Sequence, residues 1–529
     1  MNHVARFRML ERGDASRVIS GLEQRFDLIR EPEQRVQRVV YETFDWRFLA
    51  AGSVLEHRRS ADSGVLLWRS LSTGELLGQI ATDTVPRFAW ELPHAPTVDR
   101  MASITEVRAL VPLVSLDSRL DVHRVVDDEG KTVARLTLDR TRISDGEELP
   151  AVLELAPVRG YGEEVRSAAE LLSAQMTLVP EPDDVVMIAL RSVGFAPGSY
   201  SSKLRLSLDR GSTARQAWTV VLRALFATMQ ANESGLRGDV DSEFLHDFRV
   251  AVRRTRSVLA DAKDVLDPDV RAWARGEFRW VGQITSPPRD ADVFLLAFPE
   301  FEAALPPERR NDLKPFGSFL LDEQRRAHGQ LVAALDSQRY RDLVTQWREH
   351  LEAEPNGNDG VDPERTPDAA QPAIAVAGAR IRKAHRRVIR RGRAIKPTSH
   401  PEELHELRKD AKRLRYLLEC FGSLYPSDLV TPVVRELKGL QEVLGDFQDS
   451  QVQADAIERF GQQMIERNGA SAATLLAMGS IVEHLDTQGL AAQESFRHRF
   501  ERFDTKAVRR SVKRIHRGRH ISTSAEDHA

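Results

Sequence analysis

The chain has 529 residues, of which 29% are charged, and its 76 lysines and arginines nearly balance its 79 aspartates and glutamates, giving a formal net charge of -3. This length accommodates roughly two to four domains with sizeable cores, and the balanced charge excludes a global field that attracts polyanions, so such binding would need local clustering. The single cysteine, Cys420, excludes intrachain disulfides, no Cys/His spacing indicates structural zinc, and the lack of a signal-like or membrane-spanning apolar run predicts a cytoplasmic protein without a membrane partner.

Residues 1–200 predict a β-rich domain. Short alternating or β-branched runs are separated by turn signals rich in Gly, Pro and Asp, a pattern typical of an antiparallel sheet or barrel. The expected strands lie at 54–59, 65–68, 75–80, 121–126, 132–139 and 151–155. A helix is expected over 164–178, a loop over 179–183 and a linker over 198–210.

From residue 211 to residue 515 the apolar residues recur with a period near 3.6, which predicts an all-α region. The segment 354–372 is rich in Pro, Gly and Asp and predicts a flexible linker, and we expect the tail, 516–529, to be disordered. The predicted fold class is therefore α+β multidomain. An antiparallel β-barrel or tunnel domain precedes an all-α bundle of two duplicated half-bundles, about 211–353 and 373–515.

One pattern occurs twice in the helical region. The segment from His246 reads H-D-F-R-V-A-V-R-R-T-R, and the segment from His405 reads H-E-L-R-K-D-A-K-R-L-R, at a separation of 159 residues (405 − 246). At the same separation, Asp290 matches Asp449. Matching windows of this length imply a duplicated structural unit.

Each repeated segment predicts an amphipathic helix with a cationic stripe. At 100° per residue, positions 246, 249, 253 and 256 fall within about an 80° arc, and apolar residues gather on the opposite side. A solvated, salt-bridged helix face is the alternative interpretation, but the in-register repetition favours anion binding. The candidate anion-binding residues are His246, Arg249, Arg253, Arg254, Arg256, His405, Arg408, Lys412, Arg413 and Arg415.

These segments resemble the CHAD family, the conserved histidine α-helical domain, over roughly 211–515. Two further motifs carry the resemblance: Arg289-Asp290-x-Asp292-Val293, and Leu437-Lys438-x-Leu440-Gln441-x-x-Leu444-Gly445-Asp446. The resemblance implies a helical bundle whose basic surface binds inorganic polyphosphate, with some members associated with polyphosphate granules. By position, the implied binding residues are His246, Arg249, Arg253, His405, Arg408 and Lys412.

A second basic block, Arg380–Arg393, holds eight Arg or Lys residues and one His in fourteen positions, whereas its register partner around Arg223 is mostly apolar. Such a block is typical of a nucleic-acid arm, of a solvated helix face, or here of an extended polyphosphate groove. We favour the last interpretation, with contacts from Arg382, Lys383, Arg386, Arg390 and Arg393. Asp290 and Asp449, beside the stripes, are expected to hold basic side chains by charge-assisted hydrogen bonds.

The N-terminal region resembles the CYTH family, the triphosphate tunnel fold. The resemblance rests on Tyr41-Glu-Thr-Phe-Asp-Trp-Arg-Phe-Leu, on Arg58-Arg59, on Trp68-Arg69, and on Asp139 and Glu154 in later strands. It implies a closed barrel that holds a triphosphate, with basic residues on the phosphates and carboxylates on a divalent metal.

The family's Glu-x-Glu-x-Lys hallmark is missing. The corresponding stretch is His3-Val-Ala-Arg-Phe-Arg8, which has no carboxylate, and magnesium prefers carboxylate oxygens. We therefore expect a degenerate tunnel without catalysis, in which Mg or Mn would be needed only if the domain were active. The candidate tunnel contacts are Arg58, Arg69, Arg108 and Arg119 for an anion and Glu154 for a metal.

The predicted function is non-catalytic polyphosphate binding, in the cytoplasm and on polyphosphate granules. One alternative is a metal-dependent triphosphatase in the N-terminal tunnel, and another is binding to the phosphate backbone of nucleic acid. Aromatic residues make up only 6% of the chain and none lies in the basic stripes, so the stacking platforms of single-strand binders are missing.

Overall fold

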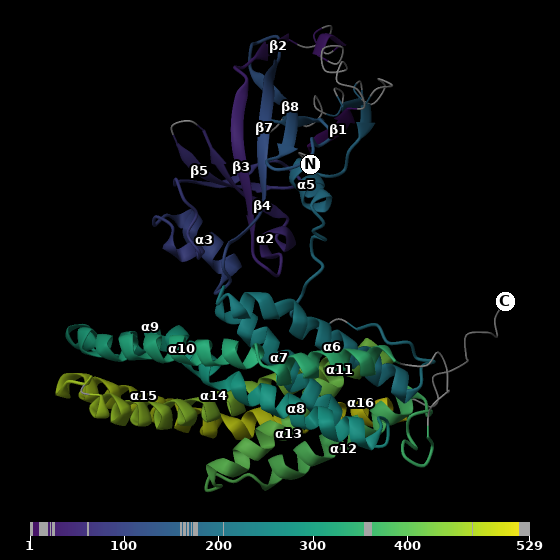
Figure 1. The fold of residues 1–529 in the computed structure, drawn as a ribbon, viewed down its shortest axis with the longest axis vertical. Helices are drawn as coiled ribbons and strands as arrows, with labels where there is room; N and C mark the ends of the chain where they lie inside the picture. The colour runs from purple at the N-terminus through teal and green to yellow at the C-terminus, as the bar shows by residue number, and fades with distance from the viewer. Residues whose placement is uncertain are drawn as a thin grey trace, which may run out of the picture. The chain divides into compact units, whose positions relative to one another are not determined.

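The computed structural model divides into two compact units, Met1–Ser202 and Lys203–Ala529. It describes residues 4–9, 19–21, 23, 27–60, 63–158, 161, 166, 169–170, 172, 178–204, 206–353, 362–467 and 469–517. Figure 1 shows that the first unit is built on a sheet and the second on helices. The predicted order of an antiparallel sheet domain followed by a helical region is confirmed. Among the described helices, none has the length and apolar character needed to cross a membrane.

The first unit is a ten-stranded antiparallel sheet in the order β10-β1-β9-β8-β7-β3-β4-β5-β6, with β2 paired to β7. Its strands are β1 Ala5–Met9, β2 Asp27–Arg30, β3 Gln34–Glu42, β4 Ser53–Arg59, β5 Gly64–Ser70, β6 Leu76–Ala81, β7 Val111–Val126, β8 Thr132–Ile143, β9 Val152–Pro157 and β10 Leu178–Pro180. Within the described residues no strand pairing joins β6 to β10, so the sheet does not close into a barrel.

Short helices accompany the sheet: α2 Arg47–Ala50, η1 Ala89–Glu91, α3 Pro96–Thr105 and α5 Val185–Ser192. The apolar face of α5 packs on a core that includes Val40 and Leu116. The helix expected over 164–178 lies largely outside the described residues. Val179 and Pro180, expected in a loop, belong instead to β10, because they pair with the edge of β1, where a strand tolerates proline.

The helical unit repeats one order of helices. Its elements are α6 Ala214–Arg237, α7 Ser242–Asp261, α8 Pro268–Ile284, α9 Ser286–Ala304, η2 Pro307–Leu313, α10 Lys314–Leu335, α11 Gln338–Glu352, α12 Ala373–Ala394, α13 Pro401–Phe421, η3 Gly422–Leu424, α14 Ser427–Glu466, α15 Ala472–Phe503 and α16 Lys506–His516. At the separation of 159 residues, α6 matches α12, α7 matches α13, and α8 with α9 matches α14.

The two copies differ where α8 ends. Pro287 and Pro288 lack the backbone N–H groups that would continue α8, so a new helix, α9, starts at Ser286. The matching positions of the second copy, 446 and 447, are Asp and Phe, and α14 continues as one helix of 40 residues.

The copies are joined by a reciprocal pair of hydrogen bonds. Ala214 N donates to Gln371 O at 2.7 Å, and Ala373 N donates to Ser212 O at 2.9 Å. Adding 159 to 212 and 214 gives 371 and 373, so equivalent groups of the two copies exchange these bonds. The helical unit therefore has a local twofold relation between its halves.

The chain between the copies is ordered near this junction. Residues 354–361 of the expected flexible linker lie outside the described residues. In the remainder, Thr366 is buried, and Asp368 N donates to Asp264 O at 2.8 Å, so this part is held against the first copy. Of the expected disordered tail, His516 ends α16, and the positions from 518 onward lie outside the described residues.

Candidate functional site

The equivalent helices α7 and α13 cross between the copies in opposite directions. Arg254 of α7 pairs with Glu419 of α13 at 2.8 Å, and the counterpart of Arg254, Arg413, pairs with Asp261 of α7. Moving forward along α7 from 254 to 261 thus corresponds to moving backward along α13 from 419 to 413. The local twofold axis passes between these helices, and Arg254 and Arg413 both take part in the contact that joins the copies.

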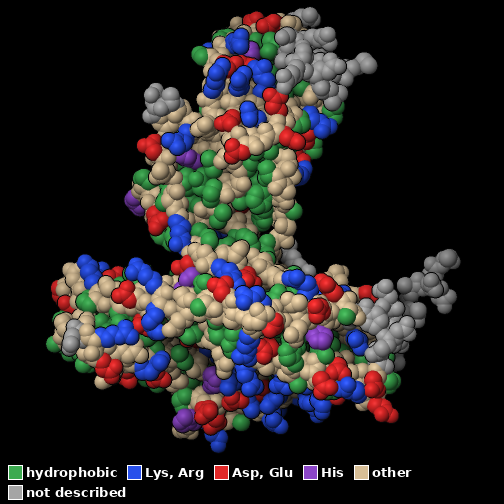
Figure 2. All heavy atoms as spheres, viewed as in Figure 1, with side chains coloured by type: hydrophobic (Ala, Val, Ile, Leu, Met, Phe, Trp, Pro, Cys, Tyr) green, Lys and Arg blue, Asp and Glu red, His purple; other side chains and the backbone are tan. Residues whose placement is uncertain are grey.

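A row of cations follows the two helices across this axis, and we call it the cross-copy cluster. Arg253 Nε donates to the Tyr416 hydroxyl at 2.6 Å, and Arg253 acts electrostatically on Lys412, which is its own counterpart in the second copy. The members of the cluster are Arg249, Arg253, Arg256, Arg279, Arg289, Arg408, Lys412 and Arg415. Figure 2 shows Lys and Arg side chains gathered over the part of the helical unit where Figure 1 places α8, α12 and α13.

The pKa of Lys412 shows the effect of the neighbouring positive charges. Burial lowers its pKa, and repulsion from Arg408, Arg253 and Arg415 lowers it further, to about 8. Asp449 opposes the shift without cancelling it. An anion placed beside Lys412 would therefore raise the pKa of this lysine and would be stabilised by its charge in return.

Two arginines of the first copy show the same imbalance. The pKa of Arg249 is lowered to about 10, by burial and by its neighbours, chiefly Arg253, despite the attraction of Asp290. The pKa of Arg256 is lowered by burial and by Arg279. In neither case does nearby negative charge offset the effects of burial and of the neighbouring cations.

Carboxylates neutralise only part of the cluster. Arg408 forms a two-pronged pair with Asp449, with Nη1–Oδ1 and Nη2–Oδ2 distances of 2.9 and 3.2 Å, and Arg415 donates to Glu419 at 2.6 Å. The expected supporting role of Asp449 is thereby confirmed. Six members make no ion pair with any residue that the structure describes: Arg249, Arg253, Arg256, Arg279, Arg289 and Lys412.

The break between α8 and α9 gives Arg249 different partners from its counterpart Arg408. Arg249 Nη1 donates to Thr285 Oγ1 at 2.9 Å and to Ser286 Oγ at 3.1 Å. A cation is favoured at this carboxyl end of α8, where backbone carbonyls lack partners. The first copy thus positions its arginine with neutral groups and keeps more net positive charge than the second.

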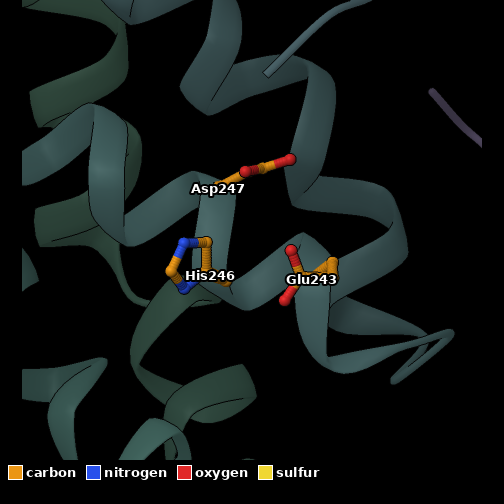
Figure 3. Close-up of side chains that lie close together, drawn as sticks. All are labelled: Glu243, His246 and Asp247. Atoms are coloured by element: carbon orange, nitrogen blue, oxygen red, sulfur yellow. The ribbon is translucent and has the colours of Figure 1, made fainter. Parts of the chain in front are cut away.

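The two candidate histidines occupy different surroundings. His246, in the first turns of α7, lies with Glu243 and Asp247, and potential ligand atoms of the three lie within 4.8 Å of one another (Figure 3). Asp241 caps this helix start, and acidic groups are favoured there by the helix dipole, which is sufficient reason for their position. His405 instead has Nδ1 at 2.6 Å from Gln448 Oε1.

A second basic surface lies between α12 and α16, and we call it the α12–α16 groove. It is a hollow of about 920 Å³. Its lining includes all five predicted contacts of the second basic block: Arg382, Lys383, Arg386, Arg390 and Arg393. Arg413 of α13 and Arg509 and Lys513 of α16 also line it, so the groove reaches the helix that carries Lys412.

The charged residues of the sheet unit form a network of their own, which we call the interior network. Glu56 is fully buried and forms ion pairs with Arg69 at 2.6 Å, Arg58 at 3.1 Å and Arg38 at 3.9 Å. Burial alone would raise the pKa of Glu56, but the three arginines hold it at about 2. The network contains four arginines and four carboxylates: Arg6, Arg38, Arg58, Arg69, Glu56, Asp139, Glu154 and Asp184.

The predicted tunnel contacts differ in their burial and in the ion pairs that they make. Arg58 and Arg69 belong to the interior network, Arg108 is buried beside Asp45 at 3.6 Å, and Arg119 is exposed on β7. Glu154 accepts from Arg6 Nε at 2.9 Å. Because each network carboxylate already pairs with an arginine, these residues do not fit a divalent metal with a bound triphosphate. Across the described part of the sheet unit, no three metal-binding side chains converge.

The family model described as the CHAD domain matches residues 220–458. The helical unit therefore contains a CHAD domain. This match confirms the resemblance carried by the two repeated segments. It spans α7 and α13 in full, together with α12 and most of α14, so the cross-copy cluster lies inside the CHAD domain.

Similar proteins extend over parts of the chain. An uncharacterized protein of Mycobacterium tuberculosis, from two strains, is 30% identical over 231 residues, which are 43% of this chain and 41% of the relative. The chain thus covers less than half of the length of these curated relatives. The CHAD domain of the plant Ricinus communis is 22% identical and covers 58% of this chain and 97% of that chain, with a TM-score of 0.48.

Two further solved structures are similar to this chain. PptA from Streptomyces chartreusis is 20% identical and covers 55% of this chain and 100% of that chain, with a TM-score of 0.40. The putative adenylyl cyclase HpAC1 from Hippeastrum, whose structure is described as revealing a dominant triphosphatase activity, is 17% identical. It covers 38% of this chain and 100% of that chain, with a TM-score of 0.29.

Sequence reasoning missed several charged residues that the fold brings together. Arg279 and Arg289 join the cross-copy cluster of the CHAD domain from α8 and α9, and Lys513 joins the groove from α16. Arg279 gave one usable signal, because its register partner is Lys438. In the sheet unit, Arg6 and Asp184 gave no signal, since their partners are distant in sequence.

Proposed function

We propose that the CHAD domain of this chain binds inorganic polyphosphate along the cross-copy cluster and does not act on it chemically. The observation that carries the proposal is the cation row contributed by both copies, in which Arg253 and Lys412 adjoin each other and the pKa of Lys412 is lowered to about 8 by burial and neighbouring arginines. Repulsion among these cations destabilises the free protein, so we infer that a polyanion binds to them and offsets the repulsion. The family resemblance implies the same ligand.

The cluster has the chemistry that phosphate oxygens require. Arginine supplies planar pairs of N–H donors, and lysine supplies a compact point charge. A polymer that meets many such groups releases its condensed counterions, by analogy with nucleic-acid backbones, so affinity should fall steeply as salt increases. Among the described residues, one group of three side chains could hold a metal ion, namely Glu243, His246 and Asp247.

The test is a titration of the full chain with long-chain polyphosphate at several salt concentrations. Because Arg253→Gln/Lys412→Met removes two charge-assisted contacts of about 1.5–3 kcal/mol each, we expect affinity to fall by about 100-fold or more. The slope of log affinity against log salt should decrease by about two. His246→Ala/His405→Ala, measured in parallel, tests the two predicted histidines separately from the arginines.

A matched control is Arg348→Gln/Arg497→Gln, which removes two positive charges from exposed positions on α11 and α15. This variant should bind polyphosphate as the parent chain does. Equal losses in the control and in the cluster variant would mean that net charge alone is responsible, and the proposal would then fail. Equal affinity of the parent chain for pyrophosphate and for long chains would also count against it.

Two experiments test the alternative functions, triphosphatase activity and nucleic-acid binding. A triphosphatase in the sheet unit would release orthophosphate from tripolyphosphate with magnesium or manganese, and the pairing of each network carboxylate with an arginine makes this the weaker candidate. Competition between duplex DNA and polyphosphate at fixed salt separates nucleic-acid binding from the proposal. We also propose a cytoplasmic location on polyphosphate granules, which fluorescence co-localisation would test.

A further inference from the structure

The α12–α16 groove holds positive charge that the protein itself does not neutralise. Five of its ten lysines and arginines form ion pairs within the helical unit: Arg380, Arg387, Arg393, Arg413 and Arg509. The other five make no ion pair with any described residue: Arg382, Lys383, Arg386, Arg390 and Lys513. Asp261, the one carboxylate among the lining residues, already pairs with Arg413. The groove therefore has a local positive field in a chain whose net charge is slightly negative.

A buried histidine provides a second, independent observation at the same place. The His385 side chain lines the groove, is 5% exposed and packs against Phe503, with ring centroids 5.6 Å apart. Its Nε2 atom is buried and has no hydrogen-bond partner in the described structure. Buried polar atoms rarely go without a partner, and a neutral imidazole offers one N–H that a phosphate oxygen can accept. Burial lowers the pKa of His385 to about 4, so this donor role needs no protonation near neutral pH.

The unpaired cations of the groove all come from the second copy. At the separation of 159 residues, four of the unpaired α12 cations correspond to Arg223, Ala224, Ala227 and Ala231 of α6. Arg223 donates to the Leu351 carbonyl at 2.8 Å and so is used within the fold. The duplicated arrangement that explains the cross-copy cluster therefore does not explain the groove.

One helix borders both basic surfaces. On α13, Lys412 lies in the cross-copy cluster, and the next residue, Arg413, lines the groove. We propose that the α12–α16 groove is a second phosphate-binding site, which takes a further segment of the polyphosphate chain held by the cross-copy cluster. This inference rests on the proposed function and deepens it, because it makes the ligand a chain long enough to occupy two surfaces.

Chain length then governs affinity. Once one segment is bound at the cluster, a second segment of the same polymer meets the groove at a high effective concentration, and linked binding of this kind raises affinity by factors of about 100 to 10,000. We expect tripolyphosphate, with only three phosphates, to occupy one site at a time and so to bind each of them separately. The full chain should show two tripolyphosphate sites and a much higher affinity for chains of hundreds of phosphates.

The experiment compares two variants of the full chain by isothermal titration with tripolyphosphate and with long-chain polyphosphate. The groove variant Arg382→Gln/Arg386→Gln/Arg390→Gln/Lys513→Met should lose one tripolyphosphate site and lower long-chain affinity at least tenfold. The cluster variant Arg253→Gln/Lys412→Met should lose the other site. His385→Phe, which adds no charge change near neutral pH, should weaken the groove site several-fold, and His385→Gln should restore part of the loss by supplying an N–H donor.

Each outcome separates this inference from the proposed function. If the groove variant keeps both its tripolyphosphate stoichiometry and its long-chain affinity, the inference is overturned while the proposed function stands. If the cluster variant changes nothing and the groove variant abolishes binding, the proposed function fails and the groove site remains. Duplex DNA that binds the groove more tightly than long-chain polyphosphate does would also overturn the inference. Unchanged circular dichroism spectra of both variants exclude unfolding as the cause.

Discussion

Lys412 lies half-buried among arginines, and its lowered pKa should rise when the proposed anionic ligand binds. Its pKa in the folded protein is about 8, against an ordinary value of 10.5, so between these pH values the unfolded chain binds more protons than the folded chain. Stability rises with pH wherever the unfolded state binds more protons. The charged lysine therefore destabilises the free fold below pH 8, and this cost disappears as pH rises towards 10.5.

From this balance we predict opposite effects of Lys412→Met on stability and on binding. The free variant should be more stable than the parent chain at pH 7, and the difference in unfolding free energy should shrink as pH rises from about 8 to 10.5. Affinity for polyphosphate should fall, and the decline in the parent chain's affinity above pH 8 should flatten in the variant. Urea denaturation and titration across pH measure both effects. A lysine with a purely structural role would lower stability when replaced.

At the scale of elements, the antiparallel contact of α7 with α13 depends on the reciprocal pairs of Arg254 with Glu419 and of Arg413 with Asp261. Asp261 is buried, and the Arg413 side chain is 34% exposed. Because Arg413 would keep part of its hydration, losing the carboxylate should cost less than breaking a fully buried pair. These pairs fix the two helices in register across the local twofold axis.

Asp261→Asn tests this contact. We expect the unfolding free energy to drop by about 1–3 kcal/mol, because Arg413 would lose its charged partner in a half-buried position. Chemical denaturation measures the drop, and the double variant Asp261→Asn/Arg413→Gln should lose less than the sum of the single losses. If Arg413 mainly serves the ligand instead, Asp261→Asn would free it and tighten polyphosphate binding with little change in stability.

The cation stripes could be predicted from the sequence, because a helix repeats every 3.6 residues and positions such as 249 and 253 must share a face. The reciprocal ion pairs could not be predicted. Asp261 corresponds to Cys420 in the second copy, and Glu419 corresponds to Ala260 in the first. Neither carboxylate is repeated in the other copy, so aligning the two copies gives no sign of these ion pairs. Only the crossing of the two helices in space brings them to Arg413 and Arg254.

In the sheet unit, strand alternation predicts on which face a side chain lies but not which distant residue it contacts. It separates the side chains of Arg58 and Arg59 onto opposite faces, as a strand requires. It does not reveal that Arg69 meets Asp184, which caps α5 and lies 115 positions further along the chain. The general fold was predictable from turn signals and periodicity, but the neutralisation of the interior arginines depends on contacts distant in sequence.

At the scale of the whole molecule, the two units differ in how they treat charge. The interior network of the sheet unit holds four arginines with four carboxylates, whereas the helical unit leaves cations of the cross-copy cluster and the groove without ion pairs among the described residues. Strong acid should therefore weaken the sheet unit. The pKa of Glu56 is lowered to about 2 from 4.5, so its stabilising contribution is complete above pH 4.5 and is lost as pH falls through about 2.

Glu56→Gln should reproduce the effect of acid at neutral pH. It leaves three arginines facing a neutral amide in a fully buried position, and we expect a loss of about 3–5 kcal/mol. Hydrogen exchange followed by mass spectrometry should show faster exchange in β3, β4 and β5, with α7 and α13 unchanged. Polyphosphate affinity should also be unchanged. A matching loss of affinity would mean that the interior network takes part in binding the polymer.

The local twofold relation has a consequence for the polyphosphate binding that we propose. A linear polyphosphate reads the same from either end, so reversing it about its midpoint leaves the molecule unchanged. Because Arg253 and Lys412 are counterparts beside the axis, the two halves of such a chain can make nearly equal contacts with the two copies. A nucleic-acid strand, whose two ends differ, would lose that equivalence. The asymmetric groove of the second half would then decide which way the remainder of the chain turns.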